Sequence, residues 1–267
     1  MKNTLLALVG VCCGFLYSCT EVEPLSLQNP YEYDEAYYRN LREYKASDHQ
    51  VCFGWLSDIA FTHCPGCRFL GIPDSLDICS LWGGIPSDVP GKHNTFYNPQ
   101  VHEEMRFVQK VKGTKVVVTL FSAKCGDDME HQDIYDIGTS SDEAIIRPAI
   151  RAYAEEIYNQ CIKCGYDGFD WDYEPTYGGK PVSEAPLWKV KKQCEIFIEE
   201  LSYWFGNGAM DPNRERGDRK MPERRLLFLI DGEVGIGQGL DKNWLSHYVD
   251  YYVLQACLLY TSPSPRD

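Results

Sequence analysis

Hydrophobic and polar positions between residues 48 and 256 divide into short apolar runs that alternate with longer amphipathic segments. The apolar runs are bounded by turn residues and are rich in β-branched and aromatic side chains, which predicts buried strands. These runs lie at 51–56, 75–82, 114–121, 166–175, 225–232 and 249–256. Helices are predicted at 31–45, 98–111, 140–164, 185–205 and 239–248. Pro148 predicts a restart or a kink within its helix.

Six strands separated by helices predict an α/β fold with a parallel sheet of right-handed βαβ units. A doubly wound sheet and a (β/α)8 TIM barrel share this alternation. A barrel has eight strands in about 250 residues, whereas residues 48–256 supply six. The tail CLLYTSPSPRD at 257–267 resembles translated read-through of a transposase-based sequencing adapter, with a genuine Pro/Ser-rich tail as the alternative. We therefore predict a (β/α)8 TIM barrel that is truncated after the sixth strand.

Residues 1–19 have the features of an export signal, with Lys2 followed by an apolar run that is too short to span a bilayer. The sequence LYSC at 16–19 resembles a bacterial lipobox. It predicts an exported outer-membrane or cell-surface lipoprotein that is anchored to a membrane by acyl chains on Cys19. A cleaved secretory signal, giving a periplasmic or secreted protein, is the alternative. Residues 20–47 are interpreted as a polar tether followed by the first helix.

The composition is that of an acidic globular protein, with 44% hydrophobic residues and a formal net charge of −13. This charge argues against binding to nucleic acid, whose backbone is anionic. Two C-x-x-C pairs, at 64–67 and 161–164, allow a zinc site. Because the pairs are far apart in sequence, buried free thiols are the favoured interpretation of Cys161 and Cys164. Export would permit a disulfide within the first pair.

The segment YDGFDWDYEP at 166–175 places four acids among glycine and large aromatic residues. Side chains of a strand alternate between its two faces. Asp170, Asp172 and Glu174 therefore share one face, and the three intervening aromatic residues share the other. A barrel strand packs its outer face on helices and turns its inner face toward the axis. We expect the acids to line the interior, with Glu174 at the carboxyl-terminal mouth.

Acids confined in this way raise one another's pKa, so at least one of them holds a proton near neutral pH. A protonated acid beside an anionic partner is the combination that cleaves glycosidic bonds. A calcium or magnesium site is the alternative, because aspartate-rich strings also bind hard cations. Calcium loops, however, interleave glycine and polar residues and not large aromatic ones. We expect no metal and no other cofactor.

The sequence DGFDWDYE at 167–174 fits the D-x-x-D-x-D-x-E signature of glycoside hydrolase family 18, and it lies on the predicted fourth strand. This family contains chitinases and endo-β-N-acetylglucosaminidases, and the chain resembles it from about residue 48 to 256. The resemblance implies hydrolysis in which the substrate's own 2-acetamido oxygen attacks the anomeric carbon. Family 18 is therefore an exception to the rule that relates the separation of two carboxylates to stereochemistry.

The resemblance also implies a role for each acid. Glu174 would protonate the leaving oxygen and later activate water. Asp172 would orient the acetamido N–H and stabilise the positive intermediate, and Asp170 would share a proton with Asp172. Asp167 has the opposite parity in the strand, so we expect it to support the strand and not the substrate.

Two departures from the chitinase pattern favour the endo-β-N-acetylglucosaminidases, which act on the diacetylchitobiose core of N-glycans. TLFSAKCGDD at 119–128 stands where chitinases have S-x-G-G, and Tyr173 precedes the catalytic glutamate where chitinases have Trp. The lipoprotein start is also similar to that of exported Bacteroidetes glycosidases. A chitinase and a catalytically silent glycan-binding protein on the same fold are the alternatives.

Four residues are candidate contacts to an N-glycan or chitin-like substrate. Gln255 matches the first residue of a Q-x-Y pattern that related enzymes have on the sixth strand. Tyr177 lies in the loop after Glu174, at the expected mouth. Trp55 and Trp82 are on or just after the first two strands and would stack on sugar rings, with packing in the core as the alternative.

Overall fold

The computed structural model describes residues 33–57, 68–82, 99–121, 137–174, 190–233 and 240–255. The chain divides into two units, Met1–Asp34 and Glu35–Asp267, and all the elements described below belong to the second. Several sequence predictions lie outside the described residues. These are the lipidation site Cys19, the candidate contact Tyr177, the C-x-x-C pair at 64–67 and the tail at 257–267.

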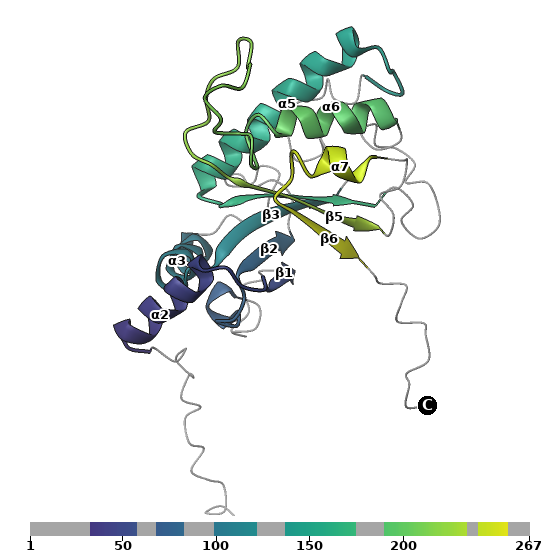
Figure 1. Ribbon diagram of the computed structural model, residues 1–267. Helices are drawn as coiled ribbons and strands as arrows, with labels where there is room; N and C mark the ends of the chain where they lie inside the picture. The colour runs from purple at the N-terminus through teal and green to yellow at the C-terminus, as the bar shows by residue number, and fades with distance from the viewer. Residues whose placement is uncertain are drawn as a thin grey trace, which may run out of the picture. The chain divides into compact units, whose positions relative to one another are not determined.

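Six parallel strands form one sheet in which every strand pairs with its neighbour in chain order (Figure 1). They are β1 Phe53–Ser57, β2 Ile78–Trp82, β3 Lys115–Phe121, β4 Gly168–Tyr173, β5 Leu227–Glu233 and β6 Tyr251–Gln255. A doubly wound sheet would reverse its strand order at a switch point, and this sheet does not. The curled sheet therefore confirms the barrel prediction and supplies six strands of the eight-stranded plan.

Helices follow the strands as the amphipathic pattern predicts. They are α2 Glu35–Ala46, α3 Pro99–Phe107, α5 Glu143–Cys164, α6 Lys191–Leu201 and α7 Lys242–Leu245, with the short turns η2 Phe69–Gly71 and η3 Val108–Lys112. Figure 1 shows α5, α6 and α7 on one side of β3 to β6. In the part of the chain that the structure describes, no helix has both the length and the apolar character needed to cross a membrane.

Local sequence determines where α5 begins and ends. The Asp142 side chain caps its first turn by accepting the N–H of Ala144 at 3.0 Å. Gly165 ends the helix with a φ of +82°, which glycine adopts at little cost. The helix is continuous through Pro148, so the predicted restart does not occur. Packing of its buried face against the sheet outweighs the one hydrogen bond that proline removes.

The outer face of the sheet forms the main hydrophobic core with the helices. Phe169, Trp171 and Tyr173 of β4 are buried in this core. The Trp171 ring meets Phe197 of α6 edge-on, with 5.1 Å between the ring centroids. The aromatic residues of the fourth strand thus lie on the helix-packed side, as the alternation predicts.

The inner face of the sheet is apolar near the amino ends of the strands and polar further along. Ile78, Val117 and Leu229 form a small buried cluster on three of the strands. Two positions later on the same strands, and so on the same face, come Ser80, Thr119 and Asp231. The apolar cluster closes the base of the inner face, and the polar side chains lie toward the carboxyl-terminal end.

An aspartate immediately before each even-numbered strand ties that strand to the preceding one. Its N–H donates to the carbonyl of a residue at the start of the preceding strand, and its carboxylate accepts the N–H of that same residue. The three pairs are Asp77 with Cys52, Asp167 with Val116 and Asp250 with Phe228. These reciprocal bonds join neighbouring strands near their amino ends, so they help to set the register in which the strands pair.

Replacing Asp167 with alanine should lower the free energy of unfolding by about 1–3 kcal/mol, because buried donors lose their acceptor. The carboxylate accepts the Val116 N–H at 3.0 Å and the Gln109 side-chain amide at 2.8 Å. Urea unfolding of the natural gene product measures the change. The exposed Asp48 provides a matched Asp48→Ala control. Equal effects of the two substitutions would contradict an anchoring role.

Candidate active site

The acids of β4 lie on the inner face of the sheet, toward its carboxyl-terminal end. The side chains of Asp170 and Asp172 are fully buried, and Glu174 follows the last residue of β4 and is partly exposed. β4 pairs with β3 on one side and β5 on the other. These two strands, with β2 and β6 beyond them, supply the neighbours of the acids.

Asp170 sits among hydroxyl groups and one further acid. Ser80 of β2 donates its hydroxyl to Oδ2 of Asp170 at 2.7 Å, and it also forms a hydrogen bond with the Thr119 hydroxyl. The acid is Asp231 of β5, whose carboxyl group lies close enough to that of Asp170 to share a hydrogen bond when one of the two is protonated. Burial, followed by the negative charge of Asp231, raises the pKa of Asp170 well above its usual value.

Asp231 is a member of this cluster that our sequence analysis did not find. It is fully buried and pairs in register with Asp172. The available signal was an acid two residues after Leu229 within the apolar run RLLFLIDG. Because side chains alternate along a strand, Asp231 lies on the same face as Leu229. Only the register between β4 and β5 places Asp231 beside Asp172.

Gln255 of β6 connects the two aspartates. Its side-chain amide nitrogen donates to Oδ1 of Asp172 at 2.9 Å and to Oδ2 of Asp231 at 2.6 Å. Both hydrogens of the amide are thereby used. The other oxygen of Asp172, Oδ2, is buried and has no hydrogen-bond partner among the described residues. This oxygen is the one that remains available to a ligand.

The protonation of the cluster follows from its burial. Burial, and after it the charges of Asp231, Glu174 and Asp170, raises the pKa of Asp172 to about 9, against the hydrogen bond from Gln255. Burial also raises the pKa of Asp231 to about 6, with hydrogen bonds from Gln255 and Asp170 acting in the opposite direction. Burial therefore favours the neutral forms of Asp170 and Asp172, and Asp231 is the most readily ionised of the three acids. A protonated acid thus lies beside an anionic one.

Trp55 and Trp82 are on the same face of the sheet as the acids. Trp55 pairs in register with Ser80, and Trp82 pairs with Ser57. Their exposed fractions are 44% and 38%, so burial in the core does not describe either side chain. Phe53, also on this face, supports Trp55 by an edge contact with 4.9 Å between ring centroids. Flat exposed aromatic rings of this kind suit stacking on sugar rings.

Not every predicted site residue belongs to the cluster. The structure brings together Asp170, Asp172 and Gln255, with Glu174 at the adjoining strand end. Asp167 lies at the opposite, amino end of β4, where it accepts hydrogen bonds from the backbone and from Gln109. Its position agrees with the supporting role that its parity suggests.

Cys161 and Cys164 are free thiols buried in the outer core. Burial raises the pKa of the Cys161 thiol, which is therefore protonated at neutral pH and contacts the carbonyl oxygen of Gly168. Among the described residues, no group of three or more His, Cys, Asp or Glu side chains is arranged to hold a metal ion.

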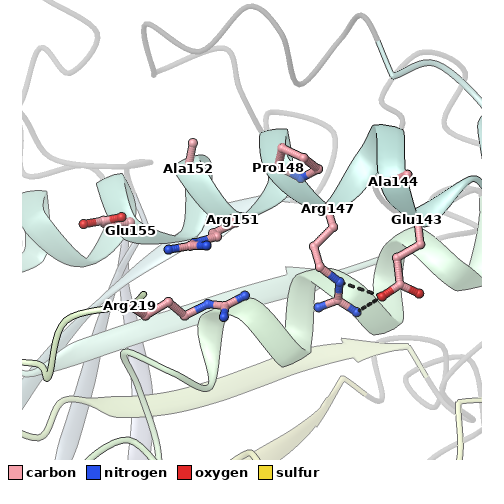
Figure 2. Close-up of a pocket in the computed structure, with 8 residues that line it drawn as sticks. All are labelled: Glu143, Ala144, Arg147, Pro148, Arg151, Ala152, Glu155 and Arg219. Carbon is pink, nitrogen blue, oxygen red and sulfur yellow. Dashed lines mark hydrogen bonds and ion pairs between the residues drawn. The ribbon is translucent and has the colours of Figure 1, made fainter. Parts of the chain in front are cut away.

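A pocket of about 570 Å³ lies elsewhere, along α5, and it contains none of these acids (Figure 2). Arg147, Arg151 and Arg219 are its charged donors, and each is already paired with an acid. Two of these arginines converge on the fully buried Glu200 of α6. These ion pairs tie α5 to α6 and to the segment before β5. Because the arginines of this pocket are already paired, we take the carboxyl cluster as the candidate active site.

The Asp172→Asn substitution should stabilise the protein at alkaline pH. The pKa of Asp172 is about 9 in the folded parent protein and about 4 in the unfolded chain. Between these two pH values the unfolded chain releases the proton more readily, so the parent protein loses stability as the pH rises. Asparagine has no proton to lose. We expect a gain on the order of 2 kcal/mol at pH 8 that diminishes toward pH 4. Thermal unfolding across this range measures it, and parallel curves for parent and variant would contradict the raised pKa.

Comparison with known proteins tests the resemblance to glycoside hydrolase family 18. The profile of glycoside hydrolase family 18, BT1044-like, matches residues 18–264. A search of curated proteins found no match. A solved selenomethionine Glu-to-Gln variant of BT1044 is 23% identical, with a TM-score of 0.55, and the match covers 83% of this chain and 61% of the other.

Endo-β-N-acetylglucosaminidase from Cordyceps militaris also matches. Its apo structure is 16% identical with a TM-score of 0.52, covering 85% of this chain and 64% of the other. A mutant of that enzyme in complex with fucosyl-N-acetylglucosamine-Asn matches with the same identity and coverage and a TM-score of 0.50. The chain spans less than two thirds of the length of these structures, and the likeness to them shows the fold. The family profile, which covers most of the chain, shows that this protein belongs to glycoside hydrolase family 18.

Proposed function

We propose that this family 18 glycoside hydrolase cleaves the GlcNAc-β-1,4-GlcNAc linkage in the core of N-glycans, with retention of configuration and participation of the substrate's acetamido group. The observation that carries the proposal is the Asp170, Asp172 and Glu174 series at the carboxyl-terminal end of β4, with one buried Asp172 oxygen left for a ligand. The separation of the acids is not used as an argument, because family 18 departs from that rule.

In the first step the glycosidic oxygen takes the proton of Glu174 as its bond to the anomeric carbon breaks. The acetamido carbonyl oxygen forms the new bond to that carbon and gives a positively charged oxazolinium ring. Oδ2 of Asp172 accepts the acetamido N–H. Burial favours the neutral form of Asp172 before the substrate binds, but this donor and the developing positive charge favour its ionised form, so Asp172 releases its proton to solvent as the substrate binds.

In the second step a water molecule attacks the anomeric carbon and the ring opens. Glu174 takes the proton of the water, so the acid, the acetamido group and the charge of the site return to their starting state. The anomeric carbon undergoes two successive displacements, each of which inverts its configuration, so the configuration is retained overall. Gln255 holds the Asp172 carboxyl group in place during both steps through its 2.9 Å hydrogen bond.

Two observations support an N-glycan over chitin as the substrate. Tyr173 stands directly before the catalytic glutamate, where chitinases have Trp. In the structure the Tyr173 ring is on the outer face of β4, in the helix-packed core and in contact with Trp171. The fold is also shared with an endo-β-N-acetylglucosaminidase that has been solved with fucosyl-N-acetylglucosamine-Asn.

The Glu174→Gln variant should lose activity by about 10²- to 10⁴-fold, the size of a general acid–base contribution. The natural gene product and the variant are incubated with a high-mannose glycoprotein, a complex-type glycoprotein and chitin oligomers. Mass spectrometry of the products should show proteins that keep a single GlcNAc. Cleavage of chitin oligomers alone would identify a chitinase, and binding without cleavage would identify a silent glycan-binding protein. Undiminished activity of Glu174→Gln would refute the mechanism.

Trp55→Ala and Trp82→Ala should each raise KM about three- to tenfold with little change in kcat, because stacking contributes roughly 1 kcal/mol to binding. Tyr44, an exposed aromatic residue of α2, provides the control Tyr44→Ala. Steady-state kinetics on a glycopeptide gives both constants. An unchanged KM in both tryptophan variants would remove these residues from the substrate site.

A further inference from the structure

Asp231 is held beside Asp172 by the backbone of its own strand. The next residue, Gly232, pairs with Tyr173 of β4. A Cβ atom on Gly232 would lie only 2.3 Å from the carbonyl oxygen of Tyr173, so only glycine permits this approach of the two strands. The dipeptide Asp231-Gly232 thus combines an inward-facing acid with the close strand contact that delivers it to the site.

The carboxyl group of Asp231 is fixed from two directions. From β6, Gln255 donates to its Oδ2 at 2.6 Å while donating to Oδ1 of Asp172 at 2.9 Å. From β4, the Asp170 carboxyl group lies close enough to share a hydrogen bond with it. Oδ1 of Asp170 and Oδ1 of Asp231 are both buried and have no hydrogen-bond partner among the described residues. Each acid can therefore serve as the partner of the other.

A hydrogen bond between two carboxyl groups requires a proton on one of them. Asp170 is the more deeply enclosed of the two, and its pKa is the more strongly raised, so Asp170 is the donor and Asp231 the acceptor. This arrangement differs from the expectation that Asp170 shares its proton with Asp172. Asp172 faces the amide of Gln255 instead.

We propose that Asp231 is a positioning residue of the reaction. It accepts a hydrogen bond from Asp170 and, through Gln255, fixes the Asp172 carboxyl group so that its second oxygen faces the substrate. The inference rests on the proposed function, because it assigns Asp172 the acetamido contact. It adds an acid on β5 to the three acids Asp170, Asp172 and Glu174 of the proposed site. The relay runs from Ser80 through Asp170, Asp231 and Gln255 to Asp172.

The relay predicts that substitutions of Asp231 and of Gln255 shift the pKa of Asp172 in opposite directions. Titratable groups that face Asp172 are Asp170 and Glu174 from β4 and Asp231 from β5, with the neutral Gln255 from β6. The negative charge of Asp231 raises the pKa of Asp172, and the hydrogen bond from Gln255 lowers it. Asp231→Asn should therefore lower that pKa, and Gln255→Met should raise it, each by about one pH unit.

Carbon-13 NMR titration of aspartate carboxyl groups in the natural gene product measures these shifts without requiring turnover. The Asp172→Asn variant assigns the signal. Asp250→Asn is the matched control, because Asp250 is also buried but lies at the amino end of β6. It should reduce stability and leave the pKa of Asp172 unchanged. A loss of packing alone would not move the pKa in opposite directions in the two test variants.

Kinetics on a fluorogenic diacetylchitobioside supplies the second readout. Asp231→Asn should reduce kcat on the order of 10²-fold, the effect of removing one preorganised hydrogen-bonding group, with KM nearly unchanged. The limb of the pH profile that follows Asp172 should move to lower pH. A parent protein without activity on any GlcNAc-GlcNAc substrate would refute the proposed function, while the NMR shifts would still decide the arrangement of the relay.

An unchanged pKa of Asp172 in Asp231→Asn, or shifts of the same sign in both variants, would overturn the proposal. Gln255 is the last residue of β6 and is only partly buried, so Gln255→Met disturbs the fold less than a substitution of the fully buried Asp231. If Asp231→Asn does not fold, Gln255→Met decides the matter. A raised pKa of Asp172 then supports the relay, and an unchanged one refutes it.

Discussion

Removal of water from the acids on the inner face of the sheet is the constraint on which the described structure depends. Asp170, Asp172 and Asp231 are fully buried on two adjacent strands. Three ionised carboxylates in this volume would cost many kcal/mol. The site avoids this cost by keeping protons on two of them and by supplying donors from other strands. The hydroxyl of Ser80 and the amide of Gln255 are the donors.

This solution requires five neighbouring strands, β2 to β6, to pair in a fixed register. The aspartates that precede β2, β4 and β6 join strands in pairs near their amino ends. Aspartate therefore has two uses on one sheet. At the amino ends it is an acceptor for backbone N–H groups that would otherwise lack partners. At the carboxyl-terminal end it is enclosed with other acids, which stabilises its neutral form.

The inner face divides into two regions with different chemistry. β1 and β2 present the exposed rings of Trp55 and Trp82. β4, β5 and β6 present the buried acids and Gln255. The outer face is uniformly apolar and packed on α5 and α6. A well-packed outer core thus supports an inner surface with exposed aromatic rings on β1 and β2 and buried acids on β4 and β5.

The amino-acid sequence alone determined the strands, the barrel plan and the face on which each β4 residue lies. Apolar runs specify strands because their side chains need burial, and a period of two specifies faces because the strand geometry is fixed. Asp170, Asp172 and Glu174 could be identified in this way, since all three lie within one short segment. The family signature identified Gln255 as well, although its partners stayed unknown.

Tertiary structure alone decided which side chains from different strands meet. Asp231 follows Asp172 by 59 positions, and no local pattern relates the two residues. Their contact depends on strand register and on the close approach that Gly232 allows. The side chains that surround Asp170, namely Ser80, Thr119 and Asp231, likewise come from other strands. A strand pattern specifies the face on which a side chain lies, but only the packing of the whole sheet sets its level relative to its neighbours.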